Sequence, residues 1–282
     1  MNIKKTKKII VKVFKPIIKS SPYFSKLYRQ SRDRKYFNSI PKETPWGFKF
    51  TGPTSMQIGE FEPEETEIFL SIIKDVDVLV NVGANVGYYC ALALSHNKYV
   101  YAFEPIQLNL NTLLKNMKIN NWEDSIEVYP LALSNKKSGV IEIYGGGTGA
   151  SLIQGWAGVK DESPSLVPIS TLDNVISDKL INKKSLILVD VEGSEKYMLE
   201  GAISTFKNDP KPIWMIEINI TEHWPKGVEI NPNLLSTFQL FWDHGYVAKT
   251  ANKENRLVTK IEIENIVNTG VDTLNFHNFL FS

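Results

Sequence analysis

The amino-acid sequence predicts an α/β fold built on a mostly parallel β-sheet that is flanked by helices on both faces. Five uninterrupted apolar runs alternate with segments of helical pattern, and such runs are typical of strands that are buried on both faces. Hydrophobic residues make up 43% of the 282 residues, which is enough for a large core and argues against disorder. The five runs span residues 77–82, 99–103, 125–133, 186–191 and 212–218.

The part of the chain before the first run is expected to form an extension, a short strand and a helix. Residues 1–45 are interpreted as the extension, and residues 46–282 as the single domain that suits a chain of this length. Residues 40–50 contain two prolines and a glycine, which predicts a loop into a short strand. Residues 59–73 are expected to form a helix, because a Glu-Pro pair near the start precedes a buried apolar face.

Four more segments have the pattern of strands. Residues 139–145 and 167–172 are expected to form strands on either side of a loop. Residues 245–250 and 275–282 are suited to an edge hairpin at the end of the chain. The stretch 144–156, in the loop between the strands expected at 139–145 and 167–172, contains five glycines. Such a loop suits a lid or an acceptor site, and an ordinary surface loop is an equally good interpretation.

The formal net charge of +1 conceals a strong asymmetry. Residues 1–35 hold twelve Lys or Arg and one acid, a net charge of +11, whereas the remainder has a net charge of −10. The apolar residues between Ile10 and Ile18 fall at helical spacing. This basic segment can therefore lie on an anionic membrane surface, or it can be a solvated arm. Because the rest of the chain is acidic, no nucleic-acid partner is expected.

The sequence carries no pattern of a membrane span or a signal peptide. No apolar run approaches the roughly 18 residues of a spanning helix. Lysines interrupt the amino-terminal apolar stretch, and no small-residue cleavage site follows it. Cys90, the one cysteine, fits a reducing compartment. We expect a cytoplasmic protein that is either free or in peripheral contact with a membrane through residues 1–35.

A glycine turn follows the first apolar run. Gly83 and Gly87 stand between a predicted strand and a predicted helix, which lets backbone N–H groups and a helix N-terminus face a ligand. Glu104 follows Gly83 by 21 residues, the spacing at which a carboxylate can bind both hydroxyls of an adenosine ribose. Asn85 replaces the middle glycine of the dinucleotide pattern G-x-G-x-x-G, which favours an adenosine without a diphosphate.

Five motifs occur in a fixed order within residues 58–282: VNVGANVGYY, AFEPIQLN, STLDNVI, VDVEGSEKYMLEGA and IWMIEIN. Their combination resembles the FkbM-type methyltransferases, a branch of the class I enzymes that depend on S-adenosylmethionine (SAM). The resemblance implies a Rossmann-like, seven-stranded, mostly parallel sheet with an antiparallel last strand. It also implies SAM as the cofactor and O-methylation of a hydroxyl, often on a sugar or another glycan-related acceptor.

The resemblance assigns cofactor-binding positions residue by residue. Two of them depart from the family pattern: Asn81 stands where the family has an aspartate that helps to hold the amino-acid part of SAM, and Leu188 stands where it has a lysine. The residues assigned to the cofactor are Asn81, Gly83, Ala84, Asn85, Gly87, Glu104, Pro105 and Asp190.

Methyl transfer to a weakly nucleophilic hydroxyl needs alignment and a base. Candidate side chains follow two adjacent runs, at strand ends that face the cleft of an open α/β sheet. We expect Asp190 to help place SAM and the acceptor, and Glu192 or His223 to take the proton. In the alternative interpretation, Asp190 caps the next helix, Glu192 pairs with Lys196 and His223 packs in a loop. No contiguous metal-ligand motif is present, so no metal is assigned.

Two other functions fit part of the pattern. An NAD-dependent oxidoreductase also needs a glycine loop and a ribose acid, although Asn85 and the DVEG segment disfavour it. A catalytically degenerate SAM-binding or scaffold protein is suggested by Asn81 and Leu188. The expected partner is a small-molecule or glycan acceptor, and the sequence leaves its identity and the oligomeric state open.

Overall fold

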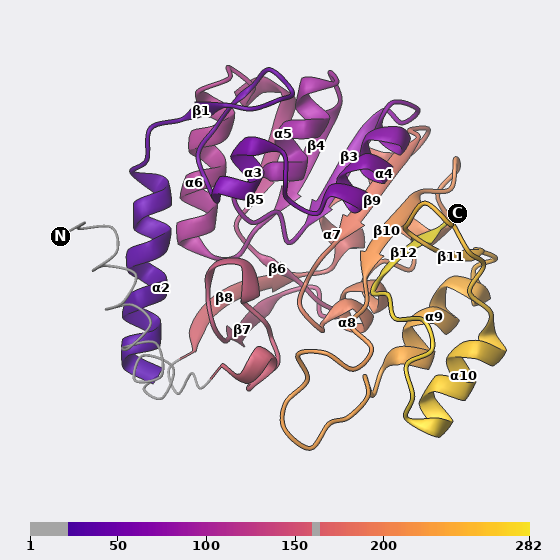
Figure 1. The fold of residues 1–282 in the computed structure, drawn as a ribbon. Helices are drawn as coiled ribbons and strands as arrows, with labels where there is room; N and C mark the ends of the chain where they lie inside the picture. The colour runs from indigo at the N-terminus through magenta and orange to yellow at the C-terminus, as the bar shows by residue number, and fades with distance from the viewer. Residues whose placement is uncertain (1–21, 160–163) are drawn as a thin grey trace.

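A seven-stranded β-sheet is the middle layer of the computed structural model, which describes residues 22–159 and 164–282 (Figure 1). The strand order is β11-β12-β10-β9-β3-β4-β5. The pairs from β10 to β5 are parallel, whereas β12 runs antiparallel to both of its neighbours. The predicted fold class is confirmed, with its antiparallel last strand. The bounds are β3 Val78–Val82, β4 Tyr99–Phe103, β5 Ile126–Tyr129, β9 Ser185–Val189, β10 Ile213–Glu217, β11 Ala248–Thr250 and β12 Asn278–Phe281.

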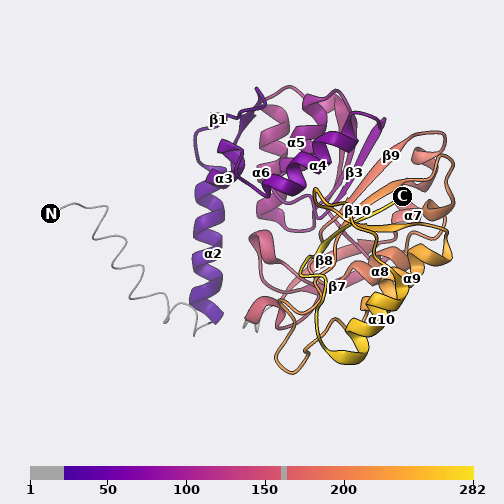
Figure 2. The same cartoon turned by 45° about the vertical axis from the view of Figure 1, so that its right-hand side comes forward.

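Helices cover both faces of this sheet, because successive side chains of a strand point to opposite sides. In β3, Val80 and Val82 face one apolar layer and Leu79 faces the other. Figure 2 shows the two groups of helices on opposite sides of the strands. On the side of Leu79 lie α3 Thr54–Ile58, α4 Pro63–Ile73, α5 Tyr88–Ser95 and α6 Gln107–Lys118. On the other side lie α7 Leu172–Ile176, α8 Glu195–Glu200, α9 Leu234–Asp243 and α10 Lys260–Thr269.

The apolar run at 125–133 does not form one strand, as predicted, but two. β5 ends at Tyr129, and Pro130 follows, which cannot donate to a strand ladder. The next residues join a separate three-stranded sheet of order β6-β8-β7. β7 and β8 are the predicted strands on either side of the glycine-rich loop. The bounds are β6 Ala132–Leu133, β7 Gly139–Ile143 and β8 Ser165–Ser170.

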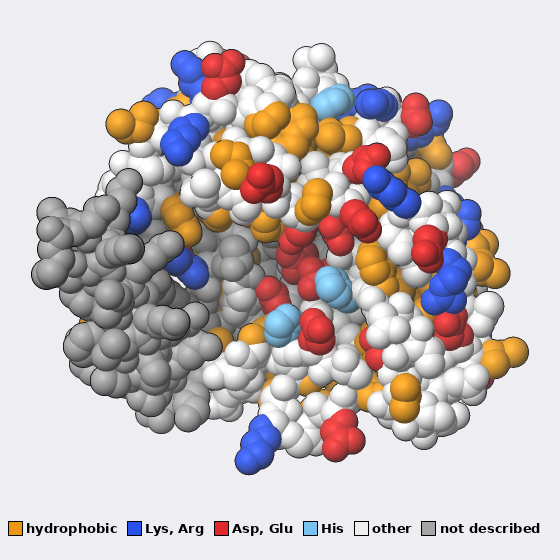
Figure 3. All heavy atoms as spheres, in the orientation of Figure 1, with side chains coloured by type: hydrophobic (Ala, Val, Ile, Leu, Met, Phe, Trp, Pro, Cys, Tyr) orange, Lys and Arg blue, Asp and Glu red, His pale blue; other side chains and the backbone are white. Residues whose placement is uncertain are grey.

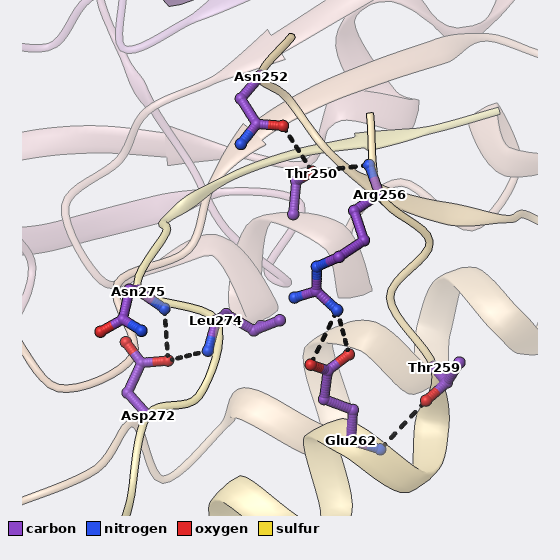
Figure 4. Close-up of polar contacts among 8 residues, drawn as sticks. All are labelled: Thr250, Asn252, Arg256, Thr259, Glu262, Asp272, Leu274 and Asn275. Carbon is purple, nitrogen blue, oxygen red and sulfur yellow. Dashed lines mark hydrogen bonds and ion pairs between the residues drawn. The ribbon is translucent and has the colours of Figure 1, made fainter. Parts of the chain in front are cut away.

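The last two strands pair antiparallel but do not form the predicted edge hairpin. α10 separates them in the chain, and β12 lies between β10 and the edge strand β11. Contacts around α10 hold this connection (Figure 4). Arg256 Nη1 donates to both carboxylate oxygens of Glu262 at 3.0 Å, and the Glu262 N–H donates to Thr259 Oγ1 at 3.3 Å. Alternating apolar residues predict strands, but they do not fix the order of strands in a sheet.

The amino-terminal helix α2 (Pro22–Phe37) lies beside α6. Lys115 Nζ of α6 donates to the carbonyl oxygens of Phe37 and Ser39, at 2.6 and 3.1 Å. The short strands β1 (Lys42–Glu43) and β2 (Lys49–Phe50) follow as an antiparallel pair. The apolar pattern predicted between Ile10 and Ile18 lies outside the described residues. None of the helices in the described ranges is long and apolar enough to cross a membrane.

Candidate active site

Gly83 is the tightest point of the turn between β3 and α5. Its φ of +83° lies in the left-handed region that favours glycine. The carbonyl oxygen of Asp190 would lie 1.8 Å from a Cβ at this position, so a side chain does not fit. The N–H groups of Gly83 and Ala84 both donate to the carbonyl oxygen of Phe103, at 3.0 and 2.9 Å. The turn is therefore held between the ends of β4 and β9.

Asn85 and Gly87 complete the turn. Asn85 has a φ of 51°, a conformation that asparagine tolerates better than most residues. Asparagine can therefore replace the middle glycine while the turn keeps its shape. Gly87 has a φ of +83° and is the N-cap of α5. A Cβ at Gly87 would lie 3.0 Å from Leu113 and 3.3 Å from Met117, so the small residue lets α5 and α6 approach closely.

Glu104 is buried at the end of β4, where three donors hold its carboxylate. The Asn85 N–H donates to Oε2 at 2.7 Å, and the Ile106 N–H and Asn109 Nδ2 donate to Oε1 at 2.8 and 3.3 Å. Burial raises the pKa of Glu104 to about 7, although these hydrogen bonds lower it. A carboxylate has about four acceptor positions, so it can also bind a ligand hydroxyl.

A cleft opens beside the Glu104 carboxylate. The turn forms one wall, and apolar side chains from the small sheet and its loops form the other. The Oγ of Ser194, also among the lining residues, is buried and has no hydrogen-bond partner in the described chain. A buried carboxylate with acceptor positions to spare, apolar walls and an unpaired hydroxyl are groups that suit a nucleoside. The lining includes Gly83, Asn85, Glu104 and Pro105 on one side and Leu131, Leu133, Ile143 and Leu152 on the other.

A second cleft, which shares Gly83 and Asp190 with the first, is strongly acidic. Glu62 lines it from the start of α4, Asp190 from the end of β9 and Glu217 from the end of β10. Its described lining contains no Lys, Arg or His. In Figure 3, acidic side chains gather in the hollow at the centre of this face, with histidine side chains beside them. A pocket with several carboxylates and no positive side chain suits a ligand that carries positive charge, as SAM does.

Asp190 lines both clefts. Burial raises the pKa of Asp190 well above its ordinary value, and the neighbouring carboxylates of Glu217 and Glu192 raise it further. Asp190 does not cap the following helix, because Ser194 is the N-cap of α8. The residue therefore lies where the two clefts meet and is not part of the helix cap.

Glu192 lies two residues further on, at a φ of 53°. Its Oε2 accepts a hydrogen bond of 2.6 Å from Trp156 Nε1. Burial raises the pKa of Glu192 to about 7; the Trp156 hydrogen bond lowers it, and repulsion by Glu217 adds to the rise. The alternative pairing with Lys196 is not formed, because Lys196 lies 3.6 Å from Glu200 instead.

His223 is exposed, and its ring lies near the same tryptophan. Its ring centroid is 5.9 Å from that of Trp156, with an angle of 54° between the planes. The Ala157 N–H donates to the His223 carbonyl oxygen at 2.6 Å. The structure therefore brings Glu192 and His223 to one aromatic side chain, although they follow different strands.

The remaining residues assigned to the cofactor divide between the two clefts. Pro105 lines the first, whereas Asn81 and Ala84 line the second. Asn81 is buried, and its Nδ2 donates to the Sγ of Cys90 at 3.3 Å. Leu188, the other departure from the family pattern, is buried and lines the second cleft. Across the described ranges, no group of three or more His, Cys, Asp or Glu is arranged to hold a metal ion.

Sequence reasoning did not assign four residues of the site. Burial raises the pKa of Glu62 to about 7 and that of Glu195 to about 8. Glu62 accepts a 2.8 Å hydrogen bond from the Tyr89 hydroxyl, and Glu195 accepts one of 2.8 Å from the Gly193 N–H. Asn109 links Glu104 to the glycine-rich loop, because its Nδ2 also donates to Gly147 O at 3.0 Å. Trp156 is the fourth. The Glu-Pro pair at a helix start was the one local signal, and it indicates a helix rather than a ligand.

The chain is similar to known proteins, among them two solved structures. The chain is similar to the precorrin-6y C5,15-methyltransferase from Geobacter metallireducens GS-15, at 13% identity over 82% of this chain and 91% of that chain, with a TM-score of 0.41. It is also similar to an O-methyltransferase from Bacillus cereus in complex with SAH, at 11% identity over 77% and 78%, with a TM-score of 0.40. The search of curated proteins found no match. Residues 81–248 match the model of the methyltransferase FkbM domain, and the chain therefore belongs to the FkbM family of methyltransferases, whose cofactor is SAM.

Proposed function

We propose that this methyltransferase transfers the methyl group of SAM to a hydroxyl of a sugar, a glycan or a related metabolite. The observation that carries the proposal is the meeting of two clefts at Asp190. The cleft beside Glu104 has a lining that suits a nucleoside. Where it meets the acidic cleft, Asp190 and Glu192 have raised pKa values. Oxygen acceptors need such a base, because a sugar hydroxyl is a weak nucleophile.

The residues that would hold the cofactor follow from the lining of the clefts. Glu104 would accept hydrogen bonds from the ribose hydroxyls, and the apolar wall at residues 131–133 would cover the base. Asn81 and Asp190 would lie toward the amino-acid part, in the acidic cleft. When bound, SAM supplies a methyl group on a positively charged sulfur.

Glu192 is the base that we favour. Its Oε2 is engaged by Trp156, which leaves Oε1 as the oxygen that can accept the hydroxyl proton. A pKa of about 7 suits a base that must be ionised near neutral pH and still bind a proton well. Asp190, which lines both clefts, would help to position SAM and the acceptor.

His223 is the second candidate for the base. Its exposed ring stands beside Trp156, and Trp224 contacts Trp156 edge-on with ring centroids 5.0 Å apart. Of these two tryptophans, Trp156 is buried and Trp224 is partly exposed. A partly exposed aromatic side chain can pack against the apolar face of a sugar ring, which supports a sugar-containing acceptor. In this arrangement His223 would take the proton from a hydroxyl that is bound further out, and Glu192 would orient the acceptor.

A binding measurement followed by an acceptor panel tests the proposal. Calorimetry should detect SAM and its demethylated product, NAD should not bind, and Glu104→Ala should weaken SAM binding by at least tenfold. The panel would offer sugars, sugar nucleotides and glycans beside amine acceptors, with products identified by mass spectrometry. O-methyl ethers should form, and Glu192→Gln or His223→Gln should lower turnover by about 10²–10⁴-fold if that residue is the base. Methylated amines without ethers would contradict the proposal.

A second candidate function is SAM binding without turnover. Two observations favour it: the Asn81 amide is engaged with Cys90, and Leu188 is a buried apolar residue in the acidic cleft. Calorimetric binding of SAM without product across the whole panel would support this candidate. Restoring the family residues with Asn81→Asp and Leu188→Lys would then be the direct check, because turnover gained by the double variant would locate the defect.

We also propose that the basic segment contacts membranes and that the chain divides into an extension, 1–45, and a catalytic domain, 46–282. The net charge of +11 in residues 1–35 supports a peripheral contact with anionic lipid. Sedimentation with phosphatidylserine vesicles, compared with neutral vesicles, tests it. Replacing the seven lysines among residues 4–19 by glutamine should abolish the difference while α2 is left intact.

A further inference from the structure

Trp156 connects the two segments that carry the candidate bases. It is buried, at 1% exposed, although it comes from the glycine-rich loop rather than from a strand. Its Nε1–H donates to Glu192 Oε2 at 2.6 Å, and its ring meets those of His223 and Trp224. An indole nitrogen can only donate, so it matches a carboxylate acceptor.

The DVEG turn is shaped to admit this indole. Gly193 has a φ of +92°, and a Cβ at that position would lie 2.5 Å from the ring of Trp156. Ser151, from the same loop, donates through Oγ to the backbone carbonyl oxygen of Glu192 at 2.6 Å. The loop therefore hydrogen-bonds to both the side chain and the backbone of Glu192.

The charge state of the Glu192 carboxylate depends on its hydrogen bond with the Trp156 indole. The neighbouring titratable groups are mostly acidic, and the Trp156 hydrogen bond is the contact that favours the ionised form. Removing that bond would leave a buried carboxylate among like charges. The titratable groups that interact with Glu192 are Glu62, Asp190, Glu195 and Glu217, and His223 contacts the Trp156 ring.

We propose that Trp156 is a positioning residue, which fixes Glu192 with Oε2 bound to the indole and Oε1 free for the acceptor proton. The proposal rests on the function proposed for Glu192. Trp156 lines neither cleft in the described residues, so it acts through Glu192 rather than on SAM.

Nuclear magnetic resonance of the full chain tests the contact without an acceptor. The indole N–H signal of Trp156, identified by its loss in Trp156→Phe, should shift with pH with a midpoint near 7, because its acceptor titrates. The shift should vanish in Glu192→Gln. Trp224→Phe is the matched control: Trp224 Nε1 donates to the Asn219 carbonyl oxygen at 3.2 Å, so its signal should not follow Glu192. A Trp156 signal that is constant from pH 5 to pH 9 would overturn the proposal.

The phenylalanine variant gives the second readout. The Glu192 carboxyl carbon, identified by its absence in Glu192→Gln, should titrate about one pH unit higher in Trp156→Phe, the shift expected for losing a hydrogen bond to a charged group. SAM affinity should change less than about twofold. An unchanged Glu192 midpoint, or a tenfold loss of SAM affinity, would contradict the positioning role. If Trp156→Phe does not fold, the indole titration of the unaltered chain and of Glu192→Gln still decides. Full turnover by Glu192→Gln would instead refute the proposed base and leave the titration result standing.

Discussion

The close approach of Gly83 and Asp190 ties the glycine turn to the end of β9. β3 and β9 are adjacent and parallel, with Val82 opposite Val189, so the residues after each strand meet at the same edge. The Asp190 N–H donates to the Val82 carbonyl oxygen at 3.0 Å, which brings the Asp190 carbonyl against Gly83. The site is therefore sensitive to a single methyl group at this point.

Gly83→Ala should lower the free energy of unfolding by about 3 kcal/mol or more, because a strained positive φ is added to a backbone clash. Urea denaturation measures the change. Gly146→Ala is the matched control, since φ there is 168° and an added Cβ meets nothing within 4 Å. That variant should stay within about 0.5 kcal/mol of the unaltered chain. Equal stability of the two variants would refute the steric argument.

At the scale of elements, features set by residues that are close together in the sequence could be predicted, whereas those set by residues far apart could not. The strand ends at Gly83, Glu104 and Asp190 could be placed because apolar runs and glycine turns are local signals. The hydrogen bond between Trp156 and Glu192 joins residues 36 apart through an irregular loop, and no local pattern encodes it. The edge hairpin was wrong because α10 separates its two strands in the chain, although β11 and β12 do pair antiparallel at the edge of the sheet.

The cap of α10 offers a test at this scale. Thr259 Oγ1 accepts from the Glu262 N–H, and the Glu262 carboxylate binds Arg256 (Figure 4). Thr259→Ala should destabilise the chain by about 1 kcal/mol, the usual effect of losing an N-cap, whereas Thr259→Ser should retain most of that stability. Thermal unfolding of both variants measures the difference. A serine variant as unstable as the alanine variant would show that the methyl group, rather than the hydroxyl, matters.

At the scale of the whole molecule, burial and mutual repulsion oppose ionisation of carboxyl groups in and beside the two clefts. Burial raises the pKa values of Glu62, Glu104 and Glu192 to about 7 and that of Glu195 to about 8, from an ordinary value of 4.5. Between about pH 4.5 and the folded-state pKa values, these groups therefore hold protons in the folded chain that they have released in the unfolded chain. A ligand that brings positive charge into the hollow relieves part of this repulsion, so cofactor binding and the charge state of the site are coupled.

The raised pKa values of these carboxyl groups predict how the free energy of unfolding depends on pH. An acid whose pKa is raised by folding contributes stability that is fully present below about 4.5 and is lost as pH rises through the folded value. The free energy of unfolding without SAM should therefore fall between about pH 5 and pH 8. Glu195→Gln should flatten that fall by about 3 kcal/mol, because the neutral amide can still accept the Gly193 N–H bond. Urea denaturation at several pH values measures the slope, with the exposed Glu229→Gln as the matched control. A slope in Glu195→Gln as steep as in the unaltered chain would mean that Glu195 is already ionised in the folded protein.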